Sequence, residues 1–180
     1  NAVALWQRGQ MYMLMGRWQA AAEDLRKAKT FSPDGFLYQH RIGLADAMLE
    51  LGRGDEAIVE LRSILDQKPE QTAVAEALID AYARVRPPRY SEAENVVYTY
   101  MRLYPKEYKW PMLLGQLGSR MQKWDKAVQG YEKAAELARD RQEVIAALFN
   151  AYKQANKPKA MTDYLAQMLS DRQLEQAPFQ

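Results

Sequence analysis

Residues 9–33 read GQMYMLMGRWQAAAEDLRKAKTFSP, and the spacing of the apolar residues in this stretch decides the fold. In its second half, steps of three, four and three positions join Trp18, Ala21, Leu25 and Ala28. Such steps return to the same side of an α-helix. A turn at Gly16 precedes this helix, and Pro33 ends it because proline cannot continue a helix. The stretch therefore predicts two helices that are joined by a short turn.

The same pattern returns four more times along the chain, and its first residues lie 36, 36, 34 and 34 positions apart. The further copies are Gly54, Ala57, Leu61 and Ile64; Tyr90, Ala93, Val97 and Tyr100; Trp124, Ala127, Tyr131 and Ala134; and Pro158, Met161, Leu165 and Met168. A second periodic segment precedes each copy, so every unit is predicted to be a helix–turn–helix. We expect one domain over residues 1–180, with repeats at about 2–35, 36–71, 72–107, 108–141 and 142–170, and residues 171–180 as a tail or the start of a further helix.

The chain resembles the tetratricopeptide repeat family, whose unit is a pair of antiparallel helices. The resemblance covers residues 2 to about 170 and rests on Gly9, Tyr12, Gly16, Trp18, Ala21, Ala28 and Pro33; on Leu44, Gly52, Ala57 and Pro69; on Leu78, Tyr82, Tyr90, Ala93 and Pro105; and on Leu114, Gly115, Trp124, Ala127 and Ala134. It implies an all-α fold, a right-handed superhelical solenoid of about five repeats. Three departures from the family pattern are two extra residues around Arg86 and Arg89, Arg139 in place of a proline, and Phe149 in place of a small residue.

Small and large residues have separate roles in the predicted packing. Four alanines at equivalent positions would let helix backbones approach closely: Ala21, Ala57, Ala93 and Ala127. Aromatic residues would fill the space beside them: Tyr12, Trp18, Tyr82, Tyr90, Trp124 and Tyr152. Residues 1–4 would enter the first helix without a capping residue before them, and Ser91 with Glu94 has the form of a capping box that would place a helix just after it.

Composition excludes several classes of protein. With 48% hydrophobic and 27% charged residues, the chain is too apolar for a disordered tail and too charged for a membrane bundle. A net charge of +2 is too weak for a protein held mainly by nucleic-acid phosphates. No run of residues is long and apolar enough to span a membrane, and residues 1–20 lack a signal-peptide layout. We expect a soluble, bacterial, periplasmic or cytoplasmic protein.

Catalytic chemistry has little support in the sequence. The chain has no cysteine, so thiolate nucleophiles, disulfides and Cys-ligated zinc are excluded. His40 is the only histidine, so a site with two histidine ligands is impossible. Gly52 and Gly54 do not form a phosphate loop, because no Gly-Lys-Ser/Thr follows them. We expect a protein that is not an enzyme and has no catalytic residue, no metal and no cofactor.

A second stripe runs along the first helix of each repeat, displaced from the core stripe. In the resembled family, the first helices line a concave groove, so the resemblance implies that this stripe binds a protein or peptide. Its residues are Trp6, Gln10 and Met13; Ile42, Asp46 and Leu49; Glu76 and Asp80; Met112, Gln116 and Ser119; and Asn150 and Lys153. The stripe is acidic in the middle and carries amides and a lysine at its last end. A merely solvated inner face is the alternative interpretation.

One subtype of the family grips the C-terminal carboxylate of chaperones with Lys, Asn and Arg side chains along this groove. The first three repeats offer Gln10, Asp46 and Asp80 at these places. Two carboxylates would repel an acidic tail, so the sequence argues against that role.

The extra residues of the third repeat form a candidate accessory loop around Arg86 and Arg89. Basic residues from Arg84 to Lys109 alternate here with tyrosines and Trp110, a pattern that could bind single-stranded nucleic acid. Solvated charges beside core aromatics are the favoured explanation, because Tyr90 and Tyr100 lie on the core stripe, and the small net charge also argues against nucleic acid. A lipid or protein contact is a further use of this loop, because an insertion adds specificity without disturbing the stacking of repeats.

Together these features predict a non-catalytic scaffold that binds a peptide or protein segment in a groove, within a multiprotein assembly. Two alternatives stay open at this point. One is that the array associates with itself through its uncapped ends. The other is that it serves as the accessory module of a longer enzyme or of a secretion or assembly protein.

Overall fold

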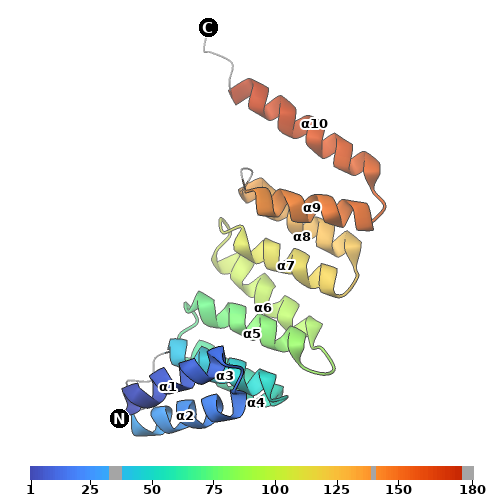
Figure 1. Ribbon diagram of the computed structural model, residues 1–180. Coiled ribbons are helices and arrows are strands. Elements are labelled where there is room, and N and C mark those ends of the chain that lie inside the picture. Colours follow the sequence, from blue (N-terminus) through green and yellow to red (C-terminus); the bar gives the residue numbers. More distant parts are fainter. Residues whose placement is uncertain (33–37, 139–140, 176–180) are drawn as a thin grey trace. The chain divides into compact units, whose positions relative to one another are not determined.

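The computed structural model describes residues 1–32, 38–138 and 141–175, and these ranges hold ten α-helices and no β-strand (Figure 1). The helices are α1 (Ala2–Leu14), α2 (Trp18–Phe31), α3 (Tyr38–Glu50), α4 (Gly54–Leu65), α5 (Thr72–Arg84), α6 (Tyr90–Leu103), α7 (Lys109–Arg120), α8 (Trp124–Leu137), α9 (Gln142–Gln154) and α10 (Pro158–Glu175). Five repeats of two helices require this number, so the prediction of an all-α array of helix–turn–helix repeats is confirmed. Pro33, Arg139 and residues 176–180 of the expected tail lie outside the described residues.

The chain divides into two compact units, an N-terminal unit (Asn1–Val96) and a C-terminal unit (Val97–Gln180). In the N-terminal unit the first five helices pack in chain order, α1 on α2, α2 on α3, α3 on α4 and α4 on α5, and α3 also contacts α1 and α5. In the C-terminal unit α8 packs on α7 and α9, and α9 packs on α10. The helices in these pairs are thus near neighbours in the chain, as expected for a repeat protein.

Small residues allow the closest helix contacts, as predicted. Ala21, Ala57, Ala93 and Ala127 are each 0% exposed. The hairpin of α7 and α8 needs glycine as well: a Cβ at Gly118 would lie 2.6 Å from the backbone nitrogen of Ala127, and one at Gly130 would clash with the backbone of Gly115. Helix backbones therefore touch directly in this repeat.

The large aromatic residues divide into two groups, which the sequence did not predict. Tyr82 and Tyr152 are buried, whereas Tyr12, Trp18, Tyr90 and Trp124 are only half-buried. Trp18, Tyr90 and Trp124 begin their helices and so lie beside the turns at the surface. The largest fully buried side chain is that of Trp110, among the described residues.

Four of the five turns inside the repeats share one backbone geometry. A residue with positive φ follows the first helix: Gly16 (69°), Gly52 (72°), Gln122 (57°) and Asn156 (53°). The next backbone N–H then donates to the carbonyl five residues earlier, over 2.8–2.9 Å, at Arg17, Arg53, Lys123 and Lys157. This is the usual way to satisfy the last carbonyls of a helix.

The third repeat closes the same hydrogen bond around its two extra residues. The N–H of Arg89 donates to the carbonyl of Tyr82, 2.8 Å away, and so spans seven residues instead of five. Arg89 therefore stands where the other repeats have Arg17, Arg53, Lys123 and Lys157. The insertion lengthens the turn without changing its end point.

Two expectations about helix starts are wrong. Asn1 caps α1, because its Oδ1 accepts a hydrogen bond from the N–H of Val3 at 3.0 Å. The helix α6 begins at Tyr90, so Ser91 lies in its first turn and not before it. The hydrogen bond from Ala93 N–H to the carbonyl of Arg89 starts this helix one position before the apparent capping box.

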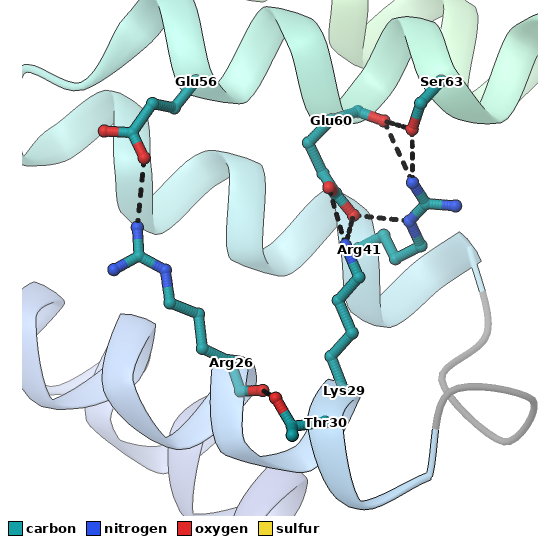
Figure 2. Close-up of polar contacts among 7 residues, drawn as sticks. All are labelled: Arg26, Lys29, Thr30, Arg41, Glu56, Glu60 and Ser63. Carbon is teal, nitrogen blue, oxygen red and sulfur yellow. Dashed lines mark hydrogen bonds and ion pairs between the residues drawn. The ribbon is translucent and has the colours of Figure 1, made fainter.

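Ion pairs join the first two repeats through Glu60 of α4 (Figure 2). Lys29 of α2 reaches both carboxylate oxygens at 2.8 Å, and Nε of Arg41 in α3 donates to Oε1 at 2.5 Å. Arg41 also donates to Ser63 Oγ, 2.5 Å away. Burial works against the charge of Glu60, but the hydrogen bonds from Arg41 and Lys29 outweigh it and lower the pKa of this carboxyl group.

None of the described helices is long and apolar enough to cross a membrane.

Candidate protein-binding surface

In the N-terminal unit, the helices that carry the predicted stripe are neighbours, since α3 contacts both α1 and α5. The rings of Trp6 and His40 lie 4.4 Å apart, which brings α1 against α3. Further along, the sulfur of Met13 faces Gly43, where an added Cβ would lie 3.6 Å from it. Trp6, Met13, Ile42 and Leu49 are half-buried and Gln10 is exposed. The surface therefore offers partly exposed apolar side chains beside polar ones.

An acidic patch of Asp46, Glu50 and Asp80 occupies the α3–α5 part of this surface. Arg84 of α5 pairs with Glu50, and its Nη1 lies 3.4 Å from Oδ2 of Asp80. One guanidinium group thus faces three carboxylates. Glu76, one helical turn before Asp80, is half-buried on the same helix. The patch thus gathers carboxylates from α3 and α5 around Arg84.

Asp46 is the least compensated member of the acidic patch. Its half-buried carboxylate makes no hydrogen bond or ion pair with the described part of the chain. Burial raises the pKa of Asp46, the carboxylates of Asp80 and Glu50 raise it further, and Arg84 offsets only part of this effect. A cation from outside the chain would relieve the unfavourable charge.

A pocket of about 520 Å³ joins the stripe to the accessory loop. Its lining residues are Leu49, Ala83, Arg84, Val85, Arg86 and Pro88. Leu49 belongs to the predicted stripe and Arg86 to the predicted loop, so the two features meet in the N-terminal unit. Arg86 is exposed and makes no ion pair with the described residues.

Arg89, in contrast, is held within the structure. Its Nε donates to Glu92 Oε1 at 2.8 Å, and its guanidinium carbon lies 5.1 Å from the ring centre of Tyr82. A longer contact of 3.4 Å reaches Asp55. Together with its backbone hydrogen bond, these contacts anchor the end of the loop, whereas Arg86 extends from it.

In the C-terminal unit, the stripe residues of α7 differ in what they can contact. Gln116 is exposed. Met112 is half-buried and packs against the hydrophobic core of α8 and α9. Ser119 Oγ donates to the carbonyl of Gly115 at 3.1 Å and lies 3.2 Å from the hydroxyl of Tyr131, so it takes part in the packing of α7 on α8. Of the three, Gln116 has the most accessible side chain.

A second pocket, of about 400 Å³, lies between α9 and α10 and includes the last two stripe residues. It is lined by Phe149, Asn150, Tyr152, Lys153, Asn156, Lys157, Pro158 and Met161. Phe149 and Met161 occupy positions that hold small residues in other repeats, such as Gly9 and Ala21. Both larger side chains line the pocket, and Figure 1 shows α10 diverging from α9. The unusual Phe149 was visible in the sequence, but the pocket that follows from it was not predicted.

The aromatic residues near the accessory loop are partly unavailable for stacking on bases. Tyr100 and Trp110 are buried, and their ring centres lie 4.7 Å apart. The hydroxyl of Tyr108 donates to Glu143 Oε1 at 3.1 Å. These positions favour core aromatics beside solvated charges as the explanation of the pattern.

Comparisons with known proteins agree with this architecture. Residues 12–81 match the family model described as tetratricopeptide repeat. Among solved structures, a crystal structure of MamA protein is similar with a TM-score of 0.66 and 15% identity, covering 99% of this chain and 97% of the other. A MamA structure from Desulfovibrio magneticus RS-1 gives 0.66 and 14% over 98% and 97%. TTC0263, a thermophilic TPR protein of Thermus thermophilus, gives 0.63 and 21% over 99% and 92%. The comparison with curated proteins gave no match.

Proposed function

We propose that this chain, which has the tetratricopeptide repeat fold and carries the family's sequence pattern over residues 12–81, is a non-catalytic scaffold that binds a segment of another protein. The binding surface is the stripe along the first helices, with the acidic patch at its centre. The observation that carries the proposal is the half-buried carboxylate of Asp46, which lies near Asp80 and Glu50, has no hydrogen-bond or ion-pair partner in the described part of the chain and is only partly offset by Arg84.

Charge defines the kind of segment that fits the N-terminal unit. A basic side chain of the partner placed on Asp46 would supply the missing cation, while Trp6, Met13 and Leu49 would contact apolar side chains. Because the helices are already packed, the scaffold loses little conformational freedom on binding. The same acidic patch disfavours an acidic tail in this unit.

The test is a charge reversal with a matched control. Asp46→Lys combined with Asp80→Lys should abolish capture of partner proteins from an extract of the source organism, whereas reversal of the exposed Asp66 should not. The affinity of a purified partner should then fall by roughly tenfold or more in the double variant. Circular dichroism confirms that each variant is folded, and an unchanged affinity in a folded double variant would remove the assignment.

An apolar face on α1 favours a second candidate function, association with another copy of the chain. Val3, Met11, Leu14 and Met15 are 58%, 51%, 83% and 60% exposed. The residues equivalent to Met11 in the later repeats are buried: Ala47, Ala81, Leu117 and Ala151. Leu165 of α10 is likewise 38% exposed, whereas the residue at the equivalent position of each other repeat is buried.

Association would place α10 of one copy against α1 of the next, since α3, α5 and α9 each pack on the second helix of the preceding repeat. Sedimentation at several concentrations tests this function. The function is supported if the mass of the wild-type chain grows with concentration while the Met11→Lys variant stays monomeric. A wild-type chain that is monomeric at every concentration excludes it.

A further inference from the structure

The pocket between α9 and α10 combines an apolar wall with a positive rim. Phe149, Tyr152 and Met161 supply ring and thioether surface. The hydroxyl of Tyr152 donates to Glu132 Oε1 at 2.6 Å, so its polar end is already satisfied within the protein. A volume of about 400 Å³ falls in the range of about 300–1,000 Å³ that is typical of ligand pockets. The space can therefore hold a large apolar side chain.

The rim of the pocket has polar groups without partners. Lys153 is exposed and makes no ion pair with the described residues, and the amides of Asn150 and Asn156 make no hydrogen bond with them. Lys157 is different, because its Nζ is held 2.6 Å from Oδ1 of Asp125. One ammonium group and two amides that have no partner among the described residues thus surround the apolar wall.

The first turn of α10 adds to the positive potential of the rim. Pro158 begins this helix, Lys159 follows it, and no acidic residue lies in the turn. The first N–H groups of a helix carry partial positive charge and favour a nearby anion. A carboxylate at the rim would meet Lys153 on one side and the start of α10 on the other.

We propose that this pocket binds a large apolar side chain that is directly adjacent to an acidic side chain on a segment of a partner protein. The inference rests on the proposed scaffold function and names the chemistry that the C-terminal unit selects. The apolar side chain fills the space against Phe149 and Met161. The carboxylate pairs with Lys153 and accepts hydrogen bonds from the amides of Asn150 and Asn156.

The experiment measures fluorescence anisotropy of short labelled peptides with the full chain. The probe has the core Leu-Glu-Phe-Asp between glycine and serine residues. One comparison peptide replaces its acidic residues with lysine, and another replaces its apolar residues with serine. The probe should bind, and both comparison peptides should bind at least about fivefold more weakly. Equal binding of either comparison peptide, or no binding of the probe at millimolar concentration, overturns the proposal.

Charge reversal at the rim locates the binding. Lys153→Glu should weaken probe binding by about fivefold or more, because it replaces an attraction with a repulsion of similar size. Lys133→Glu makes the same charge change on α8, at an exposed residue outside the pocket, and should have no effect. Equal effects of the two variants, or an unaffected Lys153→Glu variant, contradict the proposal.

Failure of this inference is distinguishable from failure of the scaffold function. If reversal of Asp46 and Asp80 abolishes partner capture while Lys153→Glu leaves probe binding intact, the scaffold function stands and the pocket assignment is wrong. If the reversed acidic patch has no effect on partner capture while Lys153→Glu weakens probe binding, the groove assignment fails and the pocket remains a separate site.

Discussion

Arg8 and Asp24 show how a single residue departs from the repeat pattern. The positions equivalent to Arg8 in the later repeats hold buried leucines: Leu44, Leu78, Leu114 and Leu148. Asp24 of α2 is 4% exposed, and Arg8 donates to its two carboxylate oxygens at 2.5 and 2.9 Å. The first repeat thus replaces an apolar contact with a bidentate ion pair, which is strongly orientated.

The first prediction concerns this pair. The hydrogen bond from Arg8 lowers the pKa of Asp24 below its ordinary value, so the pair stabilises the fold above about pH 3.9, and this stability is lost as the pH falls through the lowered value. Arg8→Gln should therefore reduce the urea midpoint at pH 7, and the difference from the wild type should shrink below pH 4. Arg62→Gln, at an exposed residue, is the control and should show no such pH dependence.

Asp46 should behave in the opposite way. Its pKa is raised, so its ionised form disfavours the fold, and the cost grows as the pH rises from about 3.9 through the raised value. Asp46→Asn should increase the urea midpoint at pH 7 and have little effect near pH 3. A lower midpoint at pH 7 would show that Asp46 has a stabilising partner.

At the scale of the helix pair, closeness depends on the residues between the two backbones. The pair α7 and α8 meets at Gly115, Gly118 and Gly130, whereas α9 and α10 are separated by Phe149 and Met161. Both pairs have similar turns with the same hydrogen bond, at Lys123 and at Lys157. The two pairs thus share their turn geometry and differ in the size of the residues between their helices, which decides how closely the helices pack.

A methyl group in the close pair should be costly. Gly130→Ala would place a Cβ against the backbone of Gly115, which cannot move aside as a flexible side chain can. We expect a loss of about 1–3 kcal/mol in the free energy of unfolding, measured by urea denaturation. Gln129→Ala, at the exposed neighbouring position, should change it by less than about 0.5 kcal/mol. Equal stability of both variants would mean that the two helices are less closely packed.

At the scale of the whole molecule, stability should be distributed locally. In the described part of the chain, the main helix contacts within each unit join near neighbours, so a defect is expected to weaken its own surroundings most. Leu148, in the core of the C-terminal unit, is 0% exposed, and so is Leu61 in the N-terminal unit. The two leucines form a matched pair for comparison.

Leu148→Ala should cost about 2–5 kcal/mol of local stability and reduce amide-exchange protection in α8 and α9 more than in α3 and α4. Leu61→Ala should reverse this order. Hydrogen exchange measured by mass spectrometry on both variants provides the check. An equal loss of protection along the described helices would indicate that the array unfolds as one cooperative block.

Much of the fold could be predicted from the amino-acid sequence, because helices and tight turns depend on neighbouring residues. The recurring steps of three and four positions placed the hairpins, and the alanines from Ala21 to Ala127 marked where helices meet. The stripe of candidate binding residues followed from the same periodicity and from the family resemblance.

Tertiary structure alone decided which charges and surfaces come together. The pairing of Arg84 with Glu50 joins side chains from different helices, the burial of Trp110 depends on helices that surround it, and the α9–α10 pocket depends on the distance between two helices. Arg86 and Arg89 are alike in sequence, yet only Arg89 closes the turn of its repeat. Local periodicity determines where a helix lies along the chain, whereas burial and ion pairing depend on contacts between residues that are distant in the sequence.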